Sequence, residues 1–110
     1  MENELKVLTE AINRFTEERD WDQFHNPKDL AIAISLEASE LLEAFLWKEP
    51  GEAKEEKIRE ELADVINYCL LLASKYDLDV FQIVMDKLRR NAEKYPVEKA
   101  KGSAKKYNEL

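Results

Sequence analysis

Apolar residues recur at three- and four-residue intervals along most of the chain, with charged and polar residues between them. In the first stretch this spacing is kept by Leu5, Leu8, Ile12 and Phe15. The interval places their side chains on one face of an α-helix and the polar residues on the other. The pattern therefore predicts an amphipathic helix over about residues 2–19.

Three further helices are predicted from the same periodicity and from residues that favour helix ends. Asn26 and Pro27 suit the N-cap and the first helical position. Asp79 followed by Gln82 resembles a capping box, and Pro50 breaks the periodicity between two apolar stretches. The predicted ranges are 27–48, 52–75 and 79–95.

Four helices with short connections predict an all-α fold, an antiparallel four-helix bundle. We expect one domain over residues 1–96 and a C-terminal tail over residues 97–110, which lacks a clear apolar period and is expected to be mobile or docked on a partner. The second and third helices carry apolar residues around much of their circumference. We therefore expect a homo-oligomer, either a dimer or a tetramer.

Composition and charge exclude several classes of partner. The formal net charge is −7, whereas a protein that grips DNA or RNA usually presents a basic face, so no polymeric nucleic acid is expected. The most apolar stretch, residues 62–73, is short and contains Asp64 and Asn67, so no membrane span is expected. The N-terminus does not resemble a signal peptide, which predicts a cytoplasmic protein. Cys69, the only cysteine, is expected to be a small core residue.

Two pairs of acidic residues interrupt the apolar stripes of the second and third helices. Glu37 and Glu40 form one pair, and Glu61 and Asp64 form the other. Each pair has i,i+3 spacing, so both members project from one face of their helix. At about 100° per residue, the apolar residues of each helix cluster around the same direction. We therefore expect all four carboxylates to face the interior of the bundle.

Four carboxylates in a partly dry interior would repel one another and lose hydration unless they are protonated or bound to cations. Mg²⁺ prefers carboxylate oxygens and often completes its shell with substrate phosphates, so it is the favoured cofactor, with Mn²⁺ as an alternative. Ordinary salt-bridging acids are the competing interpretation. A ferritin-like di-iron site would require Glu-x-x-His, and the only histidine, His25, precedes the second helix.

Basic and aromatic residues add two further hypotheses. A strip on the fourth helix could bind the outer phosphates of a triphosphate, or it could be a solvated helix end. It consists of Lys87, Arg90, Asn91 and Lys94. Aromatic rings around the second helix and on the third could sandwich a nucleobase, or they could pack in the core or an interface. They are Trp21, Phe24, His25, Trp47 and Tyr68.

These residues, in this order, resemble the all-α nucleotide pyrophosphohydrolases, a family that includes MazG and the dCTP pyrophosphatases. The family motif stands here as Glu37-Ala-Ser-Glu40 followed by Glu61-Leu-Ala-Asp64. The surrounding residues over roughly 5–107 look most like the dCTP pyrophosphatase branch. One departure is Ile12, where the animal enzymes carry a histidine that shapes the nucleotide pocket, so cytosine selectivity is open.

The resemblance implies a Mg²⁺-dependent hydrolysis of (d)NTP to (d)NMP and pyrophosphate, with dCTP or a related modified deoxynucleotide as substrate and nucleotide-pool cleansing as the role. It implies metal binding and catalysis by Glu37, Glu40, Glu61 and Asp64, and Glu40 is our choice of general base. It implies phosphate or sugar contacts from Lys87, Asn91, Lys94 and Tyr95, and a base pocket of Trp21, Phe24, His25, Trp47 and Tyr68. The alternatives are a phosphoribosyl-ATP pyrophosphohydrolase-like activity and a non-catalytic helical interaction module.

Overall fold

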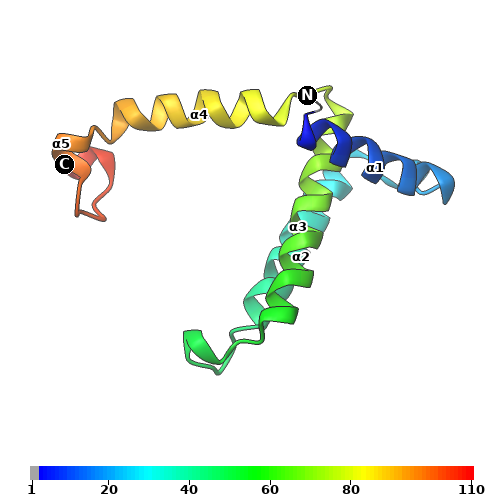
Figure 1. Cartoon of the computed structure of the whole chain (residues 1–110), viewed down its shortest axis with the longest axis horizontal. Helices are drawn as coiled ribbons and strands as arrows, with labels where there is room; N and C mark the ends of the chain where they lie inside the picture. The colour runs from blue at the N-terminus through cyan, green and yellow to red at the C-terminus, as the bar shows by residue number, and fades with distance from the viewer. Residues whose placement is uncertain (1–2) are drawn as a thin grey trace. The chain divides into compact units, whose positions relative to one another are not determined.

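A computed structural model describes residues 3–110, and in that range it contains helices and turns with no β-strand (Figure 1). The predicted all-α class is confirmed. The α-helices are α1 (Glu4–Glu18), α2 (Pro27–Glu43), α3 (Glu55–Lys75), α4 (Val80–Lys94) and α5 (Val97–Ala100). Three short 3₁₀ turns accompany them: η1 (Asp22–Phe24), η2 (Pro50–Glu52) and η3 (Tyr107–Glu109).

The chain divides after Leu78 into two compact units. In the first unit, α2 and α3 lie side by side as an antiparallel hairpin, and α1 packs against α3 (Figure 1). The second unit contains α4, α5 and η3. The predicted boundary at residue 96 lies inside this second unit, and the proposed tail contains α5 and η3, so the division into domain and tail stays a prediction.

The helices begin at the capping residues that the sequence indicates. The Asn26 side chain accepts a hydrogen bond from the backbone N–H of Asp29 at 2.9 Å, and Pro27 occupies the first helical position. The Asp79 carboxylate likewise accepts from the N–H of Gln82 at 3.1 Å. Such caps satisfy backbone donors that have no partner within the helix. These two starts are therefore fixed by local chemistry.

The prediction that the second helix continues to residue 48 is wrong, because α2 ends at Glu43. Residues 44–48 instead form tight turns, in which the N–H groups of residues 44, 45, 46 and 48 bond to the carbonyl three residues earlier. Trp47 has a left-handed backbone with φ of 62°, and Glu49 is extended with ψ of 153°. Pro50 accounts for the extended backbone of Glu49, because a proline disfavours the helical region for the residue before it. The helix is thus terminated several residues ahead of the proline.

The core of the first unit is small. Leu30, Leu70 and Leu71 are buried, whereas many large apolar side chains of the same helices are exposed, including Leu36 and Leu42. Cys69 is also exposed, so its assignment to the core is wrong. The apolar surface of α3 extends around more of the helix than α1 and α2 cover. No helix among residues 3–110 is long and apolar enough to cross a membrane.

Candidate functional site

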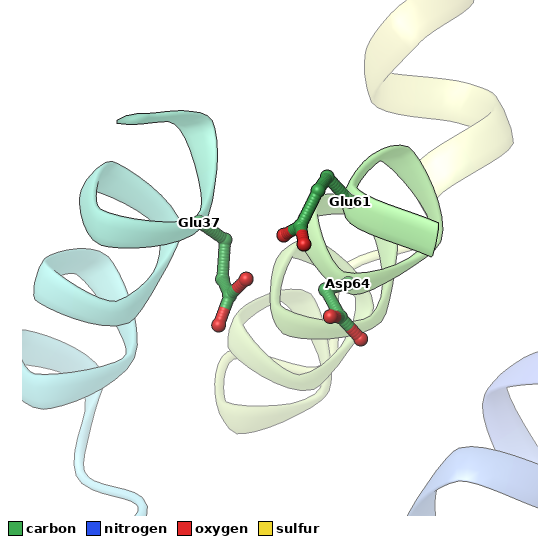
Figure 2. A group of neighbouring side chains, drawn as sticks. All are labelled: Glu37, Glu61 and Asp64. Atoms are coloured by element: carbon green, nitrogen blue, oxygen red, sulfur yellow. The ribbon is translucent and has the colours of Figure 1, made fainter. Parts of the chain in front are cut away.

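Three of the four predicted carboxylates meet between α2 and α3. Glu37 on α2 and Glu61 and Asp64 on α3 each offer an oxygen, and these oxygens lie within 4.8 Å of one another (Figure 2). Glu61 is only 5% exposed, and Glu37 is half-buried. These two positions agree with the expectation that the acids face the interior, whereas Glu40 is exposed, so the expectation is wrong for that residue. We call Glu37, Glu61 and Asp64 the acid cluster.

The electrostatics of Glu37 reflect this crowding. Burial raises the pKa of Glu37 to about 7, and the neighbouring Glu40, Asp64 and Glu61 carboxyls add to the rise. Its Oε2 atom is buried and has no hydrogen-bond partner among the described residues. Glu40 is exposed and is not one of the three clustered acids, but it is close enough to act on Glu37. The cluster therefore holds more negative charge than it can keep without a counter-ion.

Lys57 supplies part of that counter-charge. Its Nζ donates to Oε1 of Glu61 at 2.7 Å, and this contact is the main cause that lowers the pKa of Glu61. Oε2 of Glu61 is buried and has no partner among residues 3–110. Lys57 is absent from the predicted site. The sequence held one signal for it, because Lys57 precedes Glu61 by four residues, a spacing that allows an ion pair on one face of a helix.

The acid cluster fits a hard divalent cation. Buried polar oxygens are nearly always hydrogen-bonded in proteins, so two orphaned carboxylate oxygens, one on Glu37 and one on Glu61, require an explanation. A cation would satisfy both and would offset the repulsion that raises the pKa of Glu37. All three clustered side chains offer oxygen, the ligand type that Mg²⁺ and Mn²⁺ share.

A cavity of about 400 Å³ adjoins the acid cluster, because Asp64 belongs to both. Its wall is mostly apolar and aromatic and comes from α1, α3 and the connection between α1 and α2. The lining residues are Ala11, Ile12, Phe15, Thr16, Trp21, His25, Asp64, Asn67, Tyr68 and Leu71. A cavity of this size with few polar groups is typical of a small-molecule pocket. Three of the predicted base-binding residues, Trp21, His25 and Tyr68, are among them.

Local contacts hold these aromatic side chains in place. The rings of His25 and Tyr68 meet edge to face with centroids 6.4 Å apart, and Phe15 and Trp21 do so at 5.7 Å. The backbone N–H of Trp21 donates to the Thr16 carbonyl at 2.9 Å, which ties the connection to the end of α1. The aromatic wall is therefore attached to the helices that form the cavity.

Two polar groups in this pocket have no protein partner. Nδ1 of His25 is buried without a hydrogen bond among the described residues. The Asn67 side chain lines the cavity and makes no side-chain hydrogen bond to any residue from 3 to 110. Asn67 is missing from the predicted site, although it follows Asp64 at i,i+3 spacing and so lies on the same face of α3. A ligand with hydrogen-bonding edges would pair with the Asn67 amide, whereas Nδ1 of His25 is buried from the cavity.

The remaining predicted residues lie outside this pocket. Phe24 is 64% exposed and Trp47 is 99% exposed, and neither lines the cavity. Lys87, Asn91, Lys94 and Tyr95 belong to the second unit, at or near the C-terminal half of α4. There the Tyr95 and Tyr107 rings meet edge to face at 6.2 Å, and Lys94 lies over the Tyr107 ring. Their contact with a triphosphate stays a prediction.

Comparison with known proteins identifies relatives of this chain. A model of the MazG-like family matches residues 32–110. The chain is 41% identical to dCTP pyrophosphatase 1 of Mus musculus and 38% identical to that of Homo sapiens. Each match covers 96% of this chain and 67% of the relative. A crystal structure of a pyrophosphatase from Archaeoglobus fulgidus superposes with a TM-score of 0.81 and 32% identity, over 87% of this chain and 95% of that one.

Proposed function

From the premise that the chain belongs to the MazG-like family, we propose that it is a Mg²⁺-dependent nucleoside triphosphate pyrophosphohydrolase that releases a nucleoside monophosphate and pyrophosphate. The main observation that supports this proposal is the acid cluster, which has two buried oxygens without partners and lies beside an aromatic cavity. Relatives of known activity, named dCTP pyrophosphatase 1, support the reaction class.

Glu37, Glu61 and Asp64 would hold the cation, and Mn²⁺ can replace Mg²⁺ at an all-oxygen site. A cation held there would supply positive charge to polarise the phosphates and to activate the attacking water. Glu40 is close to the cluster but outside it, and exposed to solvent. It is therefore free to accept a proton from the attacking water, which supports its assignment as general base.

The cavity would hold the nucleoside. Because Asp64 lines both the cavity and the acid cluster, a base between Trp21, His25 and Tyr68 would leave the α-phosphate next to the carboxylates. Base stacking on aromatic rings contributes about 1–3 kcal/mol per base. Asn67 and Tyr68 are polar residues of the cavity wall that are available to the base or sugar.

The outer phosphates would be bound by Lys87, Asn91 and Lys94 on α4 and by Tyr95 after it. Charge-assisted hydrogen bonds from lysine are well suited to phosphate oxygens. The overall charge of −7 makes a local cationic strip useful for attracting an anionic substrate. The preferred substrate in this proposal is dCTP or a related modified deoxynucleotide, and the role is nucleotide-pool cleansing in the cytoplasm.

The active form in this proposal is a homodimer or homotetramer. Leu36, Leu42 and Ile66 are exposed on α2 and α3, at 61%, 60% and 42%. Trp47 is almost fully exposed and stands on a left-handed backbone position. An exposed tryptophan whose own backbone is in a strained conformation supports a contact with another copy of the chain, in which its ring would be covered.

The test is turnover of a panel of dNTPs and NTPs with Mg²⁺ or with EDTA, with the products resolved by ion-exchange chromatography. Monophosphate and pyrophosphate in the Mg²⁺ samples alone are expected. Glu61→Gln and Asp64→Asn should each lower kcat by at least about 100-fold, because each removes a ligand charge from the site. Glu55→Gln on the exposed start of α3 is the matched control and should be fully active. Release of orthophosphate, or near-normal turnover by Asp64→Asn, would overturn the proposal.

A further inference from the structure

The Lys57–Glu61 ion pair occupies one oxygen of a carboxylate that belongs to the acid cluster. Lys57 Nζ bonds to Oε1 at 2.7 Å, while Oε2 is buried without a hydrogen-bond partner among residues 3–110. The Glu61 side chain is 7% exposed, and that of Lys57 is 49% exposed. The pair thus joins a solvent-accessible ammonium to a carboxylate in the interior.

A second ion pair on α3, between Arg59 and Glu55, provides a comparison for the Lys57–Glu61 pair. Arg59 and Glu55 have the same i,i+4 spacing and the same 2.7 Å separation, but their side chains are 76% and 83% exposed. An exposed pair of that kind contributes little to stability and has no buried group to orient. The two pairs differ in the burial of the acid and in its membership of the acid cluster.

The bond from Lys57 to one oxygen of the Glu61 carboxylate also restricts the position of the other oxygen. A lysine ammonium is a compact charge that bonds one oxygen, whereas an arginine fork often takes both. With Oε1 fixed by Lys57, rotation of the Glu61 carboxylate is restricted, so Oε2 is the oxygen available to the acid cluster, where Glu37 and Asp64 offer theirs (Figure 2). Residues that hydrogen-bond to metal ligands commonly orient them in this way.

We propose that Lys57 is a positioning residue for the cation site: it holds Oε1 of Glu61, presents Oε2 to the cation and thereby strengthens divalent-cation binding. This inference rests on the proposed function, because it requires that the acid cluster binds a cation. The positive charge of Lys57 opposes a nearby cation, but that charge is half-exposed and screened by water. Water does not weaken the effect of orienting the buried Glu61 carboxylate. The gain in cation binding from that orientation therefore exceeds the loss from repulsion by the Lys57 charge.

The experiment is calorimetric titration of the metal-free protein with Mg²⁺ and with Mn²⁺ at one fixed pH and ionic strength. Lys57→Met removes the donor and keeps most of the aliphatic side chain, and it should weaken cation binding by about 10–100-fold. Lys57→Arg restores a cationic donor, but its fork can also bond Oε2, so it should recover only part of that loss. Arg59→Met removes the matched exposed donor and should leave the affinity within about twofold of wild type.

The outcomes distinguish failure of the positioning role of Lys57 from failure of the proposed function. Unchanged or tighter binding by Lys57→Met, with wild type binding Mg²⁺ normally, would overturn the positioning role and leave the proposed function intact. Equal weakening in Arg59→Met would also overturn it, since a general charge effect would then be responsible. No cation binding by wild type would overturn both proposals. If Lys57→Met does not fold, as judged by circular dichroism, Lys57→Leu, which also lacks a donor, provides the same comparison.

Discussion

Individual side chains set the chemistry of this site, and the acids differ sharply although they share one motif. Glu61 is buried and bonded to a lysine, Glu37 is half-buried and crowded by carboxyls, and Glu40 is exposed. These surroundings move the pKa of Glu37 up to about 7 and that of Glu61 down. The helical spacing of the motif does not reveal this difference, because it depends on how deeply each carboxyl is buried and on which charged groups lie beside it.

The raised pKa of Glu37 predicts how stability depends on pH. The ordinary value is 4.5, so between pH 4.5 and about 7 the folded protein retains a proton that the unfolded chain has released. The metal-free protein should therefore lose stability as the pH rises through this window, and the effect of Glu37 should be constant above it. Urea unfolding in EDTA at several pH values measures this, and Glu37→Gln should show a shallower decline. A steeper decline in the variant would contradict the assignment.

Mg²⁺ should reverse that trend in the wild-type protein. A cation competes with the proton on Glu37, so the stabilisation produced by a fixed Mg²⁺ concentration should be larger at pH 7.5 than at pH 5.5. Thermal unfolding with and without Mg²⁺ at both pH values checks the prediction. An equal shift in Tm at the two pH values would show that Glu37 is not linked to cation binding.

Asn67 provides a test of the cavity as the nucleoside site. Asn67→Leu keeps the approximate volume but removes the unpaired amide from the cavity wall. If the amide contacts the base or sugar, the variant should lose about 10-fold in kcat/KM for the best substrate and should discriminate less among bases. The substrate panel, repeated on this variant, measures both effects. Unchanged preference would place the base elsewhere.

At the level of helices, the starts that have a capping side chain were predicted correctly, whereas the start predicted at residue 52 is wrong, because α3 begins at Glu55 and its N-cap residue makes no side-chain capping bond. The capping bonds of Asn26 and Asp79 begin α2 and α4 where the sequence predicts. The end of α2 is different, since periodicity continues past Glu43 while the backbone turns into tight bends. Apolar spacing over residues 44–48 is compatible with both conformations, so it could not locate the end.

The cap of α2 can be tested directly. Asn26→Ala removes the 2.9 Å bond to the N–H of Asp29 and should lower the free energy of unfolding by about 0.5–2 kcal/mol. Urea denaturation measures the change. Asn26→Ser keeps an acceptor without placing a second carboxylate beside Asp29, to which the Asn26 amide donates at 2.7 Å, and it should stay close to wild type. A destabilisation as large in Asn26→Ser would contradict the capping role.

For the whole molecule, the balance of buried and exposed apolar surface predicts association. The described chain buries few large side chains, and Leu42 and Trp47 are exposed at 60% and 99%. Light scattering coupled to size-exclusion chromatography should give a dimer or tetramer, and Leu42→Glu should shift the population to smaller species, because a charge cannot be desolvated cheaply in an interface. Lys48→Glu changes a neighbouring residue that is already charged and is the control. A monomeric wild type would contradict the proposed assembly.

Interactions within a few residues were readable from the chain itself: the helical periods, the Asn26 and Asp79 caps and the two acid pairs with their family motif. These features depend on spacing along a single helix, which the residue order fixes. The close approach of Glu37 to Glu61, the exposure of Glu40 and Cys69, and the cavity that adds Asn67 to the site depended on the packed structure. They require knowing how far each helix extends and which of its faces a neighbour covers, and periodicity specifies neither.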